Sequence, residues 1–366
     1  MTDQKSQIAN HTSDGQPLSI LQVLEKGLFS TGSVVQMFQL AQGLTRRGHR
    51  VAIVSRPEGD VPQRAREEAI DFAPLPLRHE FDFPSARSLA RLYDSRKVDV
   101  VHVHKGIAHS VALFATLFTR RRPVLVVNRG VSFPLDVLNR IKYHVRMEAV
   151  VTVCEDIKKV IVASGKIPAE KVHVIYAGVD LSRFDPARAD GGRVRSELGI
   201  APDRFLLLQV GAREWKGWKD LIAASARLAG DFPKLTTVLV ACENQSKKDE
   251  VLSYARGLGI TGTLREAMAL ERPVIASGAG GNPELVIGDE SGLLVPPRDV
   301  AACAAAVRRL MEEPSLASRL ARGGRARVEK GFSSEVRLDR IEGLYRRLIA
   351  ERAREGESAR PRGAGR

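Results

Sequence analysis

Hydrophobic and polar positions follow two different patterns along this chain. Short runs of branched apolar residues, without strict polar alternation, predict strands buried on both faces of a parallel sheet. Between these runs, apolar residues recur every three or four positions, which predicts amphipathic helices. The clearest helical pattern covers residues 34–47 and ends at Gly48. The alternation of the two patterns predicts an α/β protein.

The predicted strands form two series. The first series comprises Ser19–Leu24, Val51–Ser55, Val98–Val103, Val124–Asn128, Ala149–Cys154 and Val172–Tyr176, and the second comprises Phe205–Gly211 and Thr236–Ala241. Residues 183–200 between the series are rich in Asp, Arg, Pro and Gly and lack periodicity, so we predict a linker there. Two domains, 17–182 and 201–350, are expected, since 366 residues exceed what one core usually supports. Residues 1–16 and the basic tail 351–366 are predicted to be disordered.

The alternation of strands and helices is broken once, in the second series. A predicted helix at 247–257 leads through Gly259–Gly262 directly into another predicted helix at 264–270. A strand, a helix and a further strand with short connections would occupy about 35–40 residues. We infer that about this length of chain is absent near Gly259.

Glycines at predicted strand-to-helix turns mark candidate ligand loops. Gly32 precedes the helix at 34–47, where a backbone free of a side chain and a helix N-terminus favour an anion. The segment Gly211-Ala-Arg213-Glu-Trp-Lys216-Gly217 follows the first strand of the second domain, where open α/β sheets bind ligands. Arginine offers a bidentate fork to phosphate oxygens and lysine a point charge. The two loops therefore indicate phosphate binding.

The segment 261–284 carries the most specific motif. A predicted helix begins within Thr261-Gly-Thr-Leu-Arg-Glu266. A predicted strand follows at Pro273-Val-Ile-Ala-Ser277, and a predicted turn at Gly280-Gly-Asn-Pro-Glu284. Together with the Gly211–Gly217 loop, this segment resembles the nucleotide-sugar signature of the family 4 glycosyltransferases, which are retaining enzymes. The resemblance covers about residues 18–348. It implies two Rossmann-like domains facing each other across a cleft (the GT-B type), the second short of about one strand-helix-strand unit.

The resemblance also implies roles for individual residues. The donor diphosphate would be bound by Gly32, Arg213 and Lys216, and the donor ribose and sugar by Glu266, Gly259, Thr261 and Gly262. A first glutamate of the family motif, which orders the donor sugar, falls at Leu258 in this chain. One carboxylate of the expected donor site is therefore missing.

On the acceptor side, the family often places a histidine in a loop after a strand of the first domain. Arg129 stands at the equivalent position here, and His104, at the end of the strand 98–103, is the alternative. His102 is expected on the same face as His104, but deeper in the strand. We name His104 and Arg129 as candidate catalytic residues, although a histidine in an apolar strand is also commonly a hydrogen-bonded core residue.

No Asp-x-Asp and no His/carboxylate cluster with metal-ligand spacing occurs in the sequence. We therefore expect no metal and no other cofactor, the nucleotide sugar being a co-substrate. Family members of this type hold the diphosphate with cations and helix N-termini.

The net charge of +14 bears on partners. Between residues 119 and 146, seven cations stand against one acid, with Phe133 and Tyr143 among them. Such a strip suits an anionic membrane surface, although a solvated basic face is an equal alternative. Specific nucleic-acid binding is not expected, because no recognition motif accompanies the charge. The apolar runs fall short of the roughly 20 residues that a membrane span needs. We expect a cytoplasmic protein, peripheral on the inner membrane face.

Two functions remain open. The first is an active glycosyltransferase that moves a hexose-type sugar from a nucleotide donor to a lipid-linked or polysaccharide acceptor in cell-envelope or lipopolysaccharide synthesis. The second is an inactive or binding-only member of the family, because the first glutamate and the adjoining strands of the donor site are missing.

Overall fold

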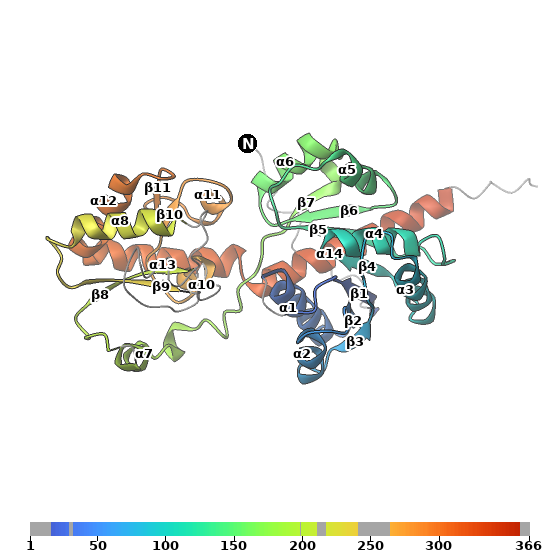
Figure 1. Cartoon of the computed structure of the whole chain (residues 1–366), viewed down its shortest axis with the longest axis horizontal. Helices are drawn as coiled ribbons and strands as arrows, with labels where there is room; N and C mark the ends of the chain where they lie inside the picture. Colours follow the sequence, from blue (N-terminus) through green and yellow to red (C-terminus); the bar gives the residue numbers. More distant parts are fainter. Residues whose placement is uncertain (1–15, 29–31, 198, 211–216, 241–263, 359–366) are drawn as a thin grey trace, which may run out of the picture. The chain divides into compact units, whose positions relative to one another are not determined.

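The structure, a computed structural model, describes residues 16–28, 32–197, 199–210, 217–240 and 264–358 (Figure 1). The chain divides into two compact units. Unit 1 comprises Met1–Gly178 together with Ser334–Arg366, and unit 2 comprises Val179–Ser333. Every strand pair within the described parts is parallel, so the predicted α/β class with parallel sheets is confirmed.

Unit 1 is built on a seven-stranded sheet with the order β3-β2-β1-β4-β5-β6-β7. Its strands are β1 (Ser19–Val23), β2 (Arg50–Ser55), β3 (Asp71–Pro74), β4 (Val100–Val103), β5 (Val124–Arg129), β6 (Ala149–Thr152) and β7 (Val172–Val174). The sequence pattern did not predict β3, because its four residues contain a charge and a proline and form no apolar run. The reversal of strand order between β1 and β4 is typical of Rossmann-like sheets.

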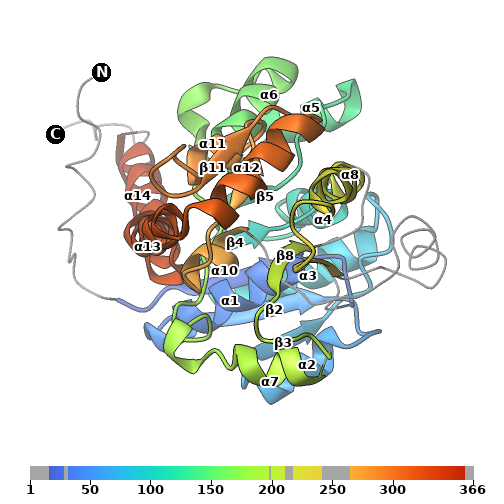
Figure 2. The same cartoon turned by 90° about the vertical axis from the view of Figure 1, so that its left-hand side faces the viewer.

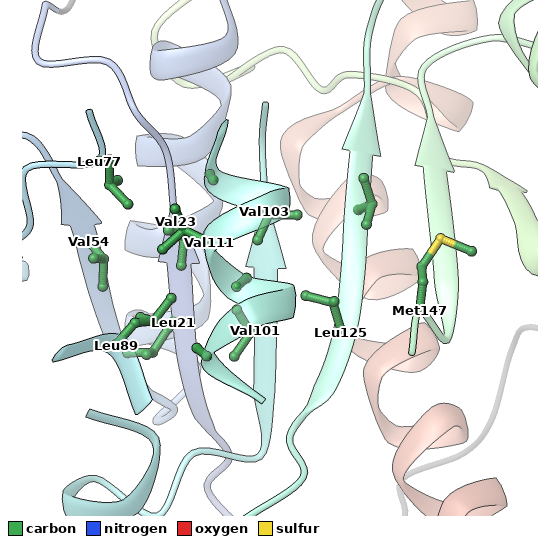
Figure 3. Packing of buried hydrophobic residues seen from close by; sticks show 14 of the residues in the cluster. Leu21, Val23, Val54, Leu77, Leu89, Val101, Val103, Val111, Leu125 and Met147 are labelled. Carbon is green, nitrogen blue, oxygen red and sulfur yellow. The ribbon is translucent and has the colours of Figure 1, made fainter. Parts of the chain in front are cut away.

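Helices cover both faces of this sheet. They are α1 (Gly32–Arg46), α2 (Val61–Glu67), α3 (Phe83–Ser95), α4 (Gly106–Ala115), α5 (Val137–His144), α6 (Glu155–Gly165) and α14 (Ser334–Ser358). Residues of α3, α4, α5 and α6 share one buried cluster with Leu21, Val101 and Leu125 of the strands (Figure 3). Residues of α1, α2 and α14 share the other cluster with Ile20 and Val100. Successive strand residues therefore point to opposite, equally buried faces.

The carboxyl-terminal helix α14 belongs to unit 1, which corrects the predicted domain boundaries. Apolar residues recur at helical spacing along α14, and Leu338, Ile341, Leu344, Tyr345 and Leu348 are all buried in the cluster with α1. The predicted second domain, 201–350, thus includes the start of a helix that completes the first. The predicted disordered tail, 351–366, is also wrong in part, because α14 continues to Ser358; residues 359–366 lie outside the described residues.

Charged and small residues fit α14 against α1. Arg47, just after α1, forms ion pairs with Glu335, Asp339 and Glu342 of α14, at N–O distances of 2.8, 2.7 and 3.2 Å. On α1 itself, a Cβ atom at Gly43 would lie 2.4 Å from Leu338 Cδ1. The two helices therefore approach so closely that any side chain at this position would force Leu338 to move.

The helix α1 also contacts both places where the chain passes between the units. Gln36 Nε2 donates to the Gly178 carbonyl at 3.5 Å, and the Gln36 carbonyl accepts from Arg337 Nη1 at 2.9 Å. Gly178 is the residue at which the chain leaves unit 1, and α14 begins where it returns. The first and last parts of unit 1 are thereby held to the same helix.

Unit 2 contains two parallel strand pairs among its described residues. In the first pair β8 (Phe205–Val210) lies beside β9 (Leu235–Val240), and in the second β10 (Ile275–Ser277) lies beside β11 (Leu293–Val295). The helices are α7 (Gly191–Glu197), α8 (Trp218–Leu228), α10 (Leu264–Ala269), α11 (Asn282–Leu285), α12 (Val300–Glu312) and α13 (Pro314–Gly331). Side chains of α8 and α12 pack with Leu207, Leu235 and Ile275. One apolar layer therefore joins both strand pairs.

The predicted linker at 183–200 is not a separate segment. It lies within unit 2 and contains α7. The Asp190 Oδ1 atom caps the N-terminus of this helix by accepting a hydrogen bond from the Arg193 amide at 2.9 Å. Residues 241–263, in which we inferred a missing strand-helix-strand unit, lie outside the described residues, so that inference stays a prediction.

Replacing Gly43 by alanine should destabilise the protein by about 1–3 kcal/mol, because the new methyl group collides with Leu338. The matched control is Gly343→Ala on α14, where a Cβ atom meets nothing within 4 Å. That change should stabilise the protein by roughly 0.5–1 kcal/mol through backbone entropy. Urea denaturation of both variants measures the two effects, and equal effects of the same sign would contradict the described contact between α1 and α14.

Candidate functional site

The carboxyl edge of the sheet in unit 1 is where α1 and α4 begin, and parallel sheets bind ligands at this edge. Gly32, predicted in the turn before the helix, is the first residue of α1. Glu25 follows β1 and accepts a hydrogen bond from the amide of Ala108, near the start of α4, at 3.2 Å. Sequence analysis missed Glu25, although an acid placed directly after a buried strand is a usable signal.

Two glycines bring the loops after β1 and β2 together at this edge. A Cβ atom on Gly27 would lie 1.9 Å from the Glu58 carbonyl oxygen, and one on Gly59 would lie 2.3 Å from the Gly27 carbonyl oxygen. The Gly27 carbonyl also accepts from the amide of Val61 at 3.0 Å. These contacts fix the chain at Gly27 against the loop after β2, and sequence analysis did not single out either glycine.

His104 is buried beside His102, and both belong to a hydrogen-bonded chain of side chains from three elements. His104 Nε2 donates to Gln22 Oε1 at 2.7 Å, since an amide oxygen only accepts. Gln22 Nε2 lies 3.4 Å from the Tyr345 hydroxyl, and that hydroxyl lies 2.6 Å from His102 Nδ1. The two imidazole rings stack with centroids 4.5 Å apart, which confirms that the histidines share a face.

This arrangement keeps both histidines neutral. Burial, followed by the positive charge of Arg337, lowers the pKa of His104 to about 3. Burial lowers the pKa of His102 well below its ordinary value, with further contributions from His104 and Arg337. Within the described residues, His104 Nδ1 and His102 Nε2 have no hydrogen-bond partner. His104 therefore presents a neutral ring with one unpartnered acceptor nitrogen.

The structure does not bring Arg129 and His104 together. Register pairs His102 with Val126 and Val103 with Val127, so Asn128 and not Arg129 lies beside His104 on the same face. Arg129 points to the opposite face, where its Nη2 donates to the Phe133 carbonyl at 2.6 Å. It also donates to the Tyr143 hydroxyl. The catalytic roles named for His104 and Arg129 stay predictions, and the two side chains do not form one cluster.

The candidate diphosphate loop of unit 2 leaves the carboxyl end of β8, as predicted. Arg213 and Lys216 lie outside the described residues, which resume at Gly217. Gly217 has a left-handed backbone, with φ +70°, and it immediately precedes α8. The next residue, Trp218, is fully buried and anchors the start of that helix. The described residues on either side of 211–216 thus belong to the strand β8 and to a helix start anchored by a buried aromatic side chain.

Glu266 lies in the first turn of α10 and is partly exposed, whereas Gly259, Thr261 and Gly262 lie outside the described residues. The turn after β10 is closed by Asn282, whose Nδ2 donates to the carbonyl and hydroxyl oxygens of Ser277 at 3.1 and 3.2 Å. Gly280 in this turn has φ +57°. Asn282 thus shapes the turn, as the motif indicated.

The described parts of the chain contain two further cavities. A cavity of about 420 Å³ in unit 1 is lined by Arg121, Arg122 and Arg352, and one of about 360 Å³ in unit 2 lies between α8 and α12. Neither contains a residue that the sequence predicted for donor or acceptor. The described residues contain no cluster of His, Cys, Asp and Glu suited to a metal ion, and no helix among them is long and apolar enough to cross a membrane.

Acidification should destabilise the protein through its buried histidines. The folded-state pKa of His104 lies below the value near 6.5 of an unfolded chain, so stability is intact above pH 6.5 and falls as the pH drops toward 3. At pH 5 the loss is about 2 kcal/mol per such histidine. His104→Gln should lose less stability between pH 7.5 and pH 5 than the unchanged protein, and the exposed-site control His79→Gln should not. Denaturant titrations at both pH values measure this, and equal losses in all three proteins would contradict it.

Comparisons with known proteins agree with the motifs. The family model described as Glycosyltransferase Family 4 matches residues 30–183, and the model described as Glycosyl transferases group 1 matches residues 250–313. The D-inositol 3-phosphate glycosyltransferase 1 of Catenulispora acidiphila is 29% identical over 254 residues. This match includes 58% of the present chain and 59% of that relative, so the chain spans about three fifths of the relative's length.

Solved structures share the fold over nearly the whole chain. A glycosyltransferase from Rickettsia africae has a TM-score of 0.82 and 20% identity, with 92% of this chain and 99% of that chain covered. The Anabaena protein HepE in complex with UDP has a TM-score of 0.75 and 18% identity, with 89% and 99% covered. The family models and the shared fold lead to one conclusion: the chain is similar to the family 4 glycosyltransferases over the matched residues of both units, and it has the fold of the GT-B glycosyltransferases.

Proposed function

We propose that this chain transfers a hexose-type sugar from a nucleotide-sugar donor to a hydroxyl group of a lipid-linked or polysaccharide acceptor. The observation that carries the proposal is the α10–β10–α11 segment of unit 2. It has the order of elements that the nucleotide-sugar motif requires, with Glu266 in the first turn and a turn closed by Asn282 after the strand. Relatives support the donor class: HepE has been solved with UDP and with UDP-glucose.

The donor is proposed to be held mainly by unit 2. Arg213 and Lys216 belong to the loop at the carboxyl end of β8, where both cations would neutralise the diphosphate. As the bond from the sugar to the phosphate breaks, negative charge grows on the leaving nucleoside diphosphate, and fixed cations stabilise that charge. The Glu266 carboxylate would accept hydrogen bonds from the ribose hydroxyls.

Transfer is proposed to retain the configuration at the sugar carbon, as in the family that the sequence resembles. The acceptor hydroxyl would attack from the face on which the phosphate leaves, and the leaving phosphate would take the hydroxyl proton. In this scheme no side chain needs to be the base. A neutral His104 with an unpartnered Nδ1 is compatible with positioning, while its depressed pKa makes it a poor proton acceptor near neutral pH.

The proposal also covers the class of acceptor and the place of the reaction in the cell. A lipid-linked acceptor in cell-envelope or lipopolysaccharide synthesis would place the chain at the cytoplasmic face of a membrane. The competing function is a binding-only member of the family, because Leu258 stands where a sugar-ordering glutamate is expected. A protein of that kind would bind the nucleotide and fail to transfer the sugar, so binding and transfer have to be measured separately.

Thermal unfolding with UDP, GDP, ADP and their sugars should identify the donor. A ligand at about 100 times its dissociation constant stabilises the native state by about 2.7 kcal/mol. The double variant Arg213→Ala/Lys216→Ala should lose this stabilisation, whereas Arg188→Ala/Arg193→Ala, two exposed arginines of the same unit, should keep it. No stabilisation of a cooperatively unfolding protein by any nucleotide would refute the proposed donor site. Stabilisation without release of nucleoside diphosphate in the presence of acceptor extracts would indicate the binding-only function.

Replacing Glu266 by glutamine should weaken nucleotide binding by roughly 10- to 100-fold, since hydrogen bonds to a charged acceptor contribute about 1.5–3 kcal/mol. The control is Glu271→Gln, which changes an exposed acid shortly after the same helix. Titration calorimetry with the nucleotide found above measures both constants. Equal affinity of the two variants would mean that Glu266 only complements the helix dipole.

A further inference from the structure

Unit 1 exposes large apolar side chains on the face formed by α3, α4 and α5. Phe81 and Leu117 are each 65% exposed, and Ile141 on α5 is 57% exposed. Phe83 at the start of α3 and Phe118 just after α4 are also exposed. Single exposed apolar residues are ordinary on a protein surface, but a group of this size on neighbouring elements marks an interaction site. We call this surface the α3–α5 face.

Ring contacts join the aromatic residues of this face. The rings of Phe81 and Phe83 both pack against Phe114 of α4, with centroid distances of 5.9 and 5.0 Å. The guanidinium of Arg87 on α3 lies 5.0 Å from the centroid of the Phe118 ring. The three ring contacts therefore join α3, the loop before it and the carboxyl-terminal end of α4.

Two polar contacts attach α5 to the same surface. Lys142 Nζ forms an ion pair with Glu80 Oε1 at 2.9 Å, next to Phe81. Arg146, just after α5, donates to the carbonyl and hydroxyl oxygens of Thr116 at 3.1 and 2.9 Å, next to Leu117. The exposed Ile141 thus lies on a helix that is held to both ends of the aromatic group.

The surroundings of this apolar group are strongly basic. Residues 78–146 contain thirteen Arg and Lys against five Asp and Glu. Each of the five acids has a partner: Glu80 pairs with Lys142, Asp82 and Asp136 cap helices, Asp94 accepts from Thr119, and Asp99 accepts from the amide of Ser19. Exposed cations at Arg87, Arg91 and Arg120 lie on α3 or just beyond α4. Arg96 in this range pairs with Asp71 outside it, so the positive charge of the α3–α5 face rests on exposed cations such as Arg87, Arg91 and Arg120.

We propose that the α3–α5 face docks on an anionic lipid bilayer. Aromatic and aliphatic side chains surrounded by Arg and Lys match the interface of such a bilayer, where the rings enter the headgroup region and the cations meet lipid phosphates. A second copy of the chain is a poorer occupant, because a twofold contact would bring the same cations against each other. DNA would use the cations and leave the apolar residues without a role.

The basic strip that the sequence indicated is only part of this surface. Tyr143, which lies within that strip, is buried, whereas Phe81, Phe83 and Arg87 come from a segment some 40 residues earlier. The docking adds to the proposed function and rests on it in one respect: a lipid-linked acceptor would be presented at this membrane. Its test does not depend on sugar transfer.

The test is sedimentation of the full chain with vesicles of phosphatidylcholine alone and of phosphatidylcholine with phosphatidylglycerol. Binding is expected only to the anionic vesicles. Arg87→Gln/Arg91→Gln/Arg120→Gln should weaken it on the order of 100-fold, whereas the charge-matched control Arg66→Gln/Arg188→Gln/Arg193→Gln should weaken it far less. Phe81→Ser/Leu117→Ser should weaken it at least tenfold, and its control, Leu28→Ser/Leu208→Ser, changes exposed apolar residues elsewhere.

Several outcomes would overturn the docking proposal. They are no binding to anionic vesicles, equal binding to neutral vesicles, and equal loss in the control variants. If the protein is a dimer and Phe81→Ser/Leu117→Ser makes it monomeric, the face binds a second copy of the chain. If the triple arginine variant reduces DNA binding and leaves vesicle binding unchanged, the face binds nucleic acid. Circular dichroism confirms that each variant folds. Failure of the donor proposal would show separately, as loss of the nucleotide-dependent stabilisation with vesicle binding unchanged.

Discussion

The packing of α14 against the sheet of unit 1 is the contact on which the rest of the structure depends. A parallel sheet with branched residues on both faces must be covered twice, and α1 and α2 share one of those faces with a helix from the far end of the chain. Apolar residues of α14 fill that face, and the buried Tyr345 among them is hydrogen-bonded to His102 and Gln22. Unit 2 is consequently an insertion between two segments of unit 1, both of which are held by Gln36 of α1.

The same contact shapes the candidate acceptor side. Buried polar groups are costly unless they are hydrogen-bonded, and the side chains of Gln22, His102, His104 and Tyr345 meet this requirement largely among themselves. The network lies at the end of the sheet at which α1 and α4 begin, and α14 contributes the Tyr345 hydroxyl to it. On the opposite face of the sheet, Arg129 is held by Phe133 and Tyr143 of the loop and helix that follow it. The two candidate residues, His104 and Arg129, therefore lie on opposite faces of the sheet and have separate sets of partners.

Much of this fold could be predicted from the sequence. Apolar runs predicted six of the seven strands of unit 1, and helical spacing predicted α1 and α10 to within two residues. β3 was missed because Asp71–Pro74 contains no apolar run. The boundary at residue 350 was wrong because a spacing pattern shows that Leu338, Ile341 and Leu344 share a helix face, but not which sheet that face covers.

For the site, alternation along β4 correctly placed His102 and His104 together. The register between β4 and β5, which sets Arg129 on the other face, is a tertiary property that no local pattern contains.

The late position of α14 in the chain has a consequence for biosynthesis. A ribosome releases β1 to β7 well before it releases residues 334–358, because all of unit 2 is made in between. During that interval the face of the sheet that carries Ile20, Val100 and Val124 is without its last covering helix, and exposed apolar surface of this kind favours aggregation of nascent chains. Unit 1 is thus the first part of the protein to be translated and the last to be finished, so the nascent chain is exposed to chaperones and proteases until its final residues emerge.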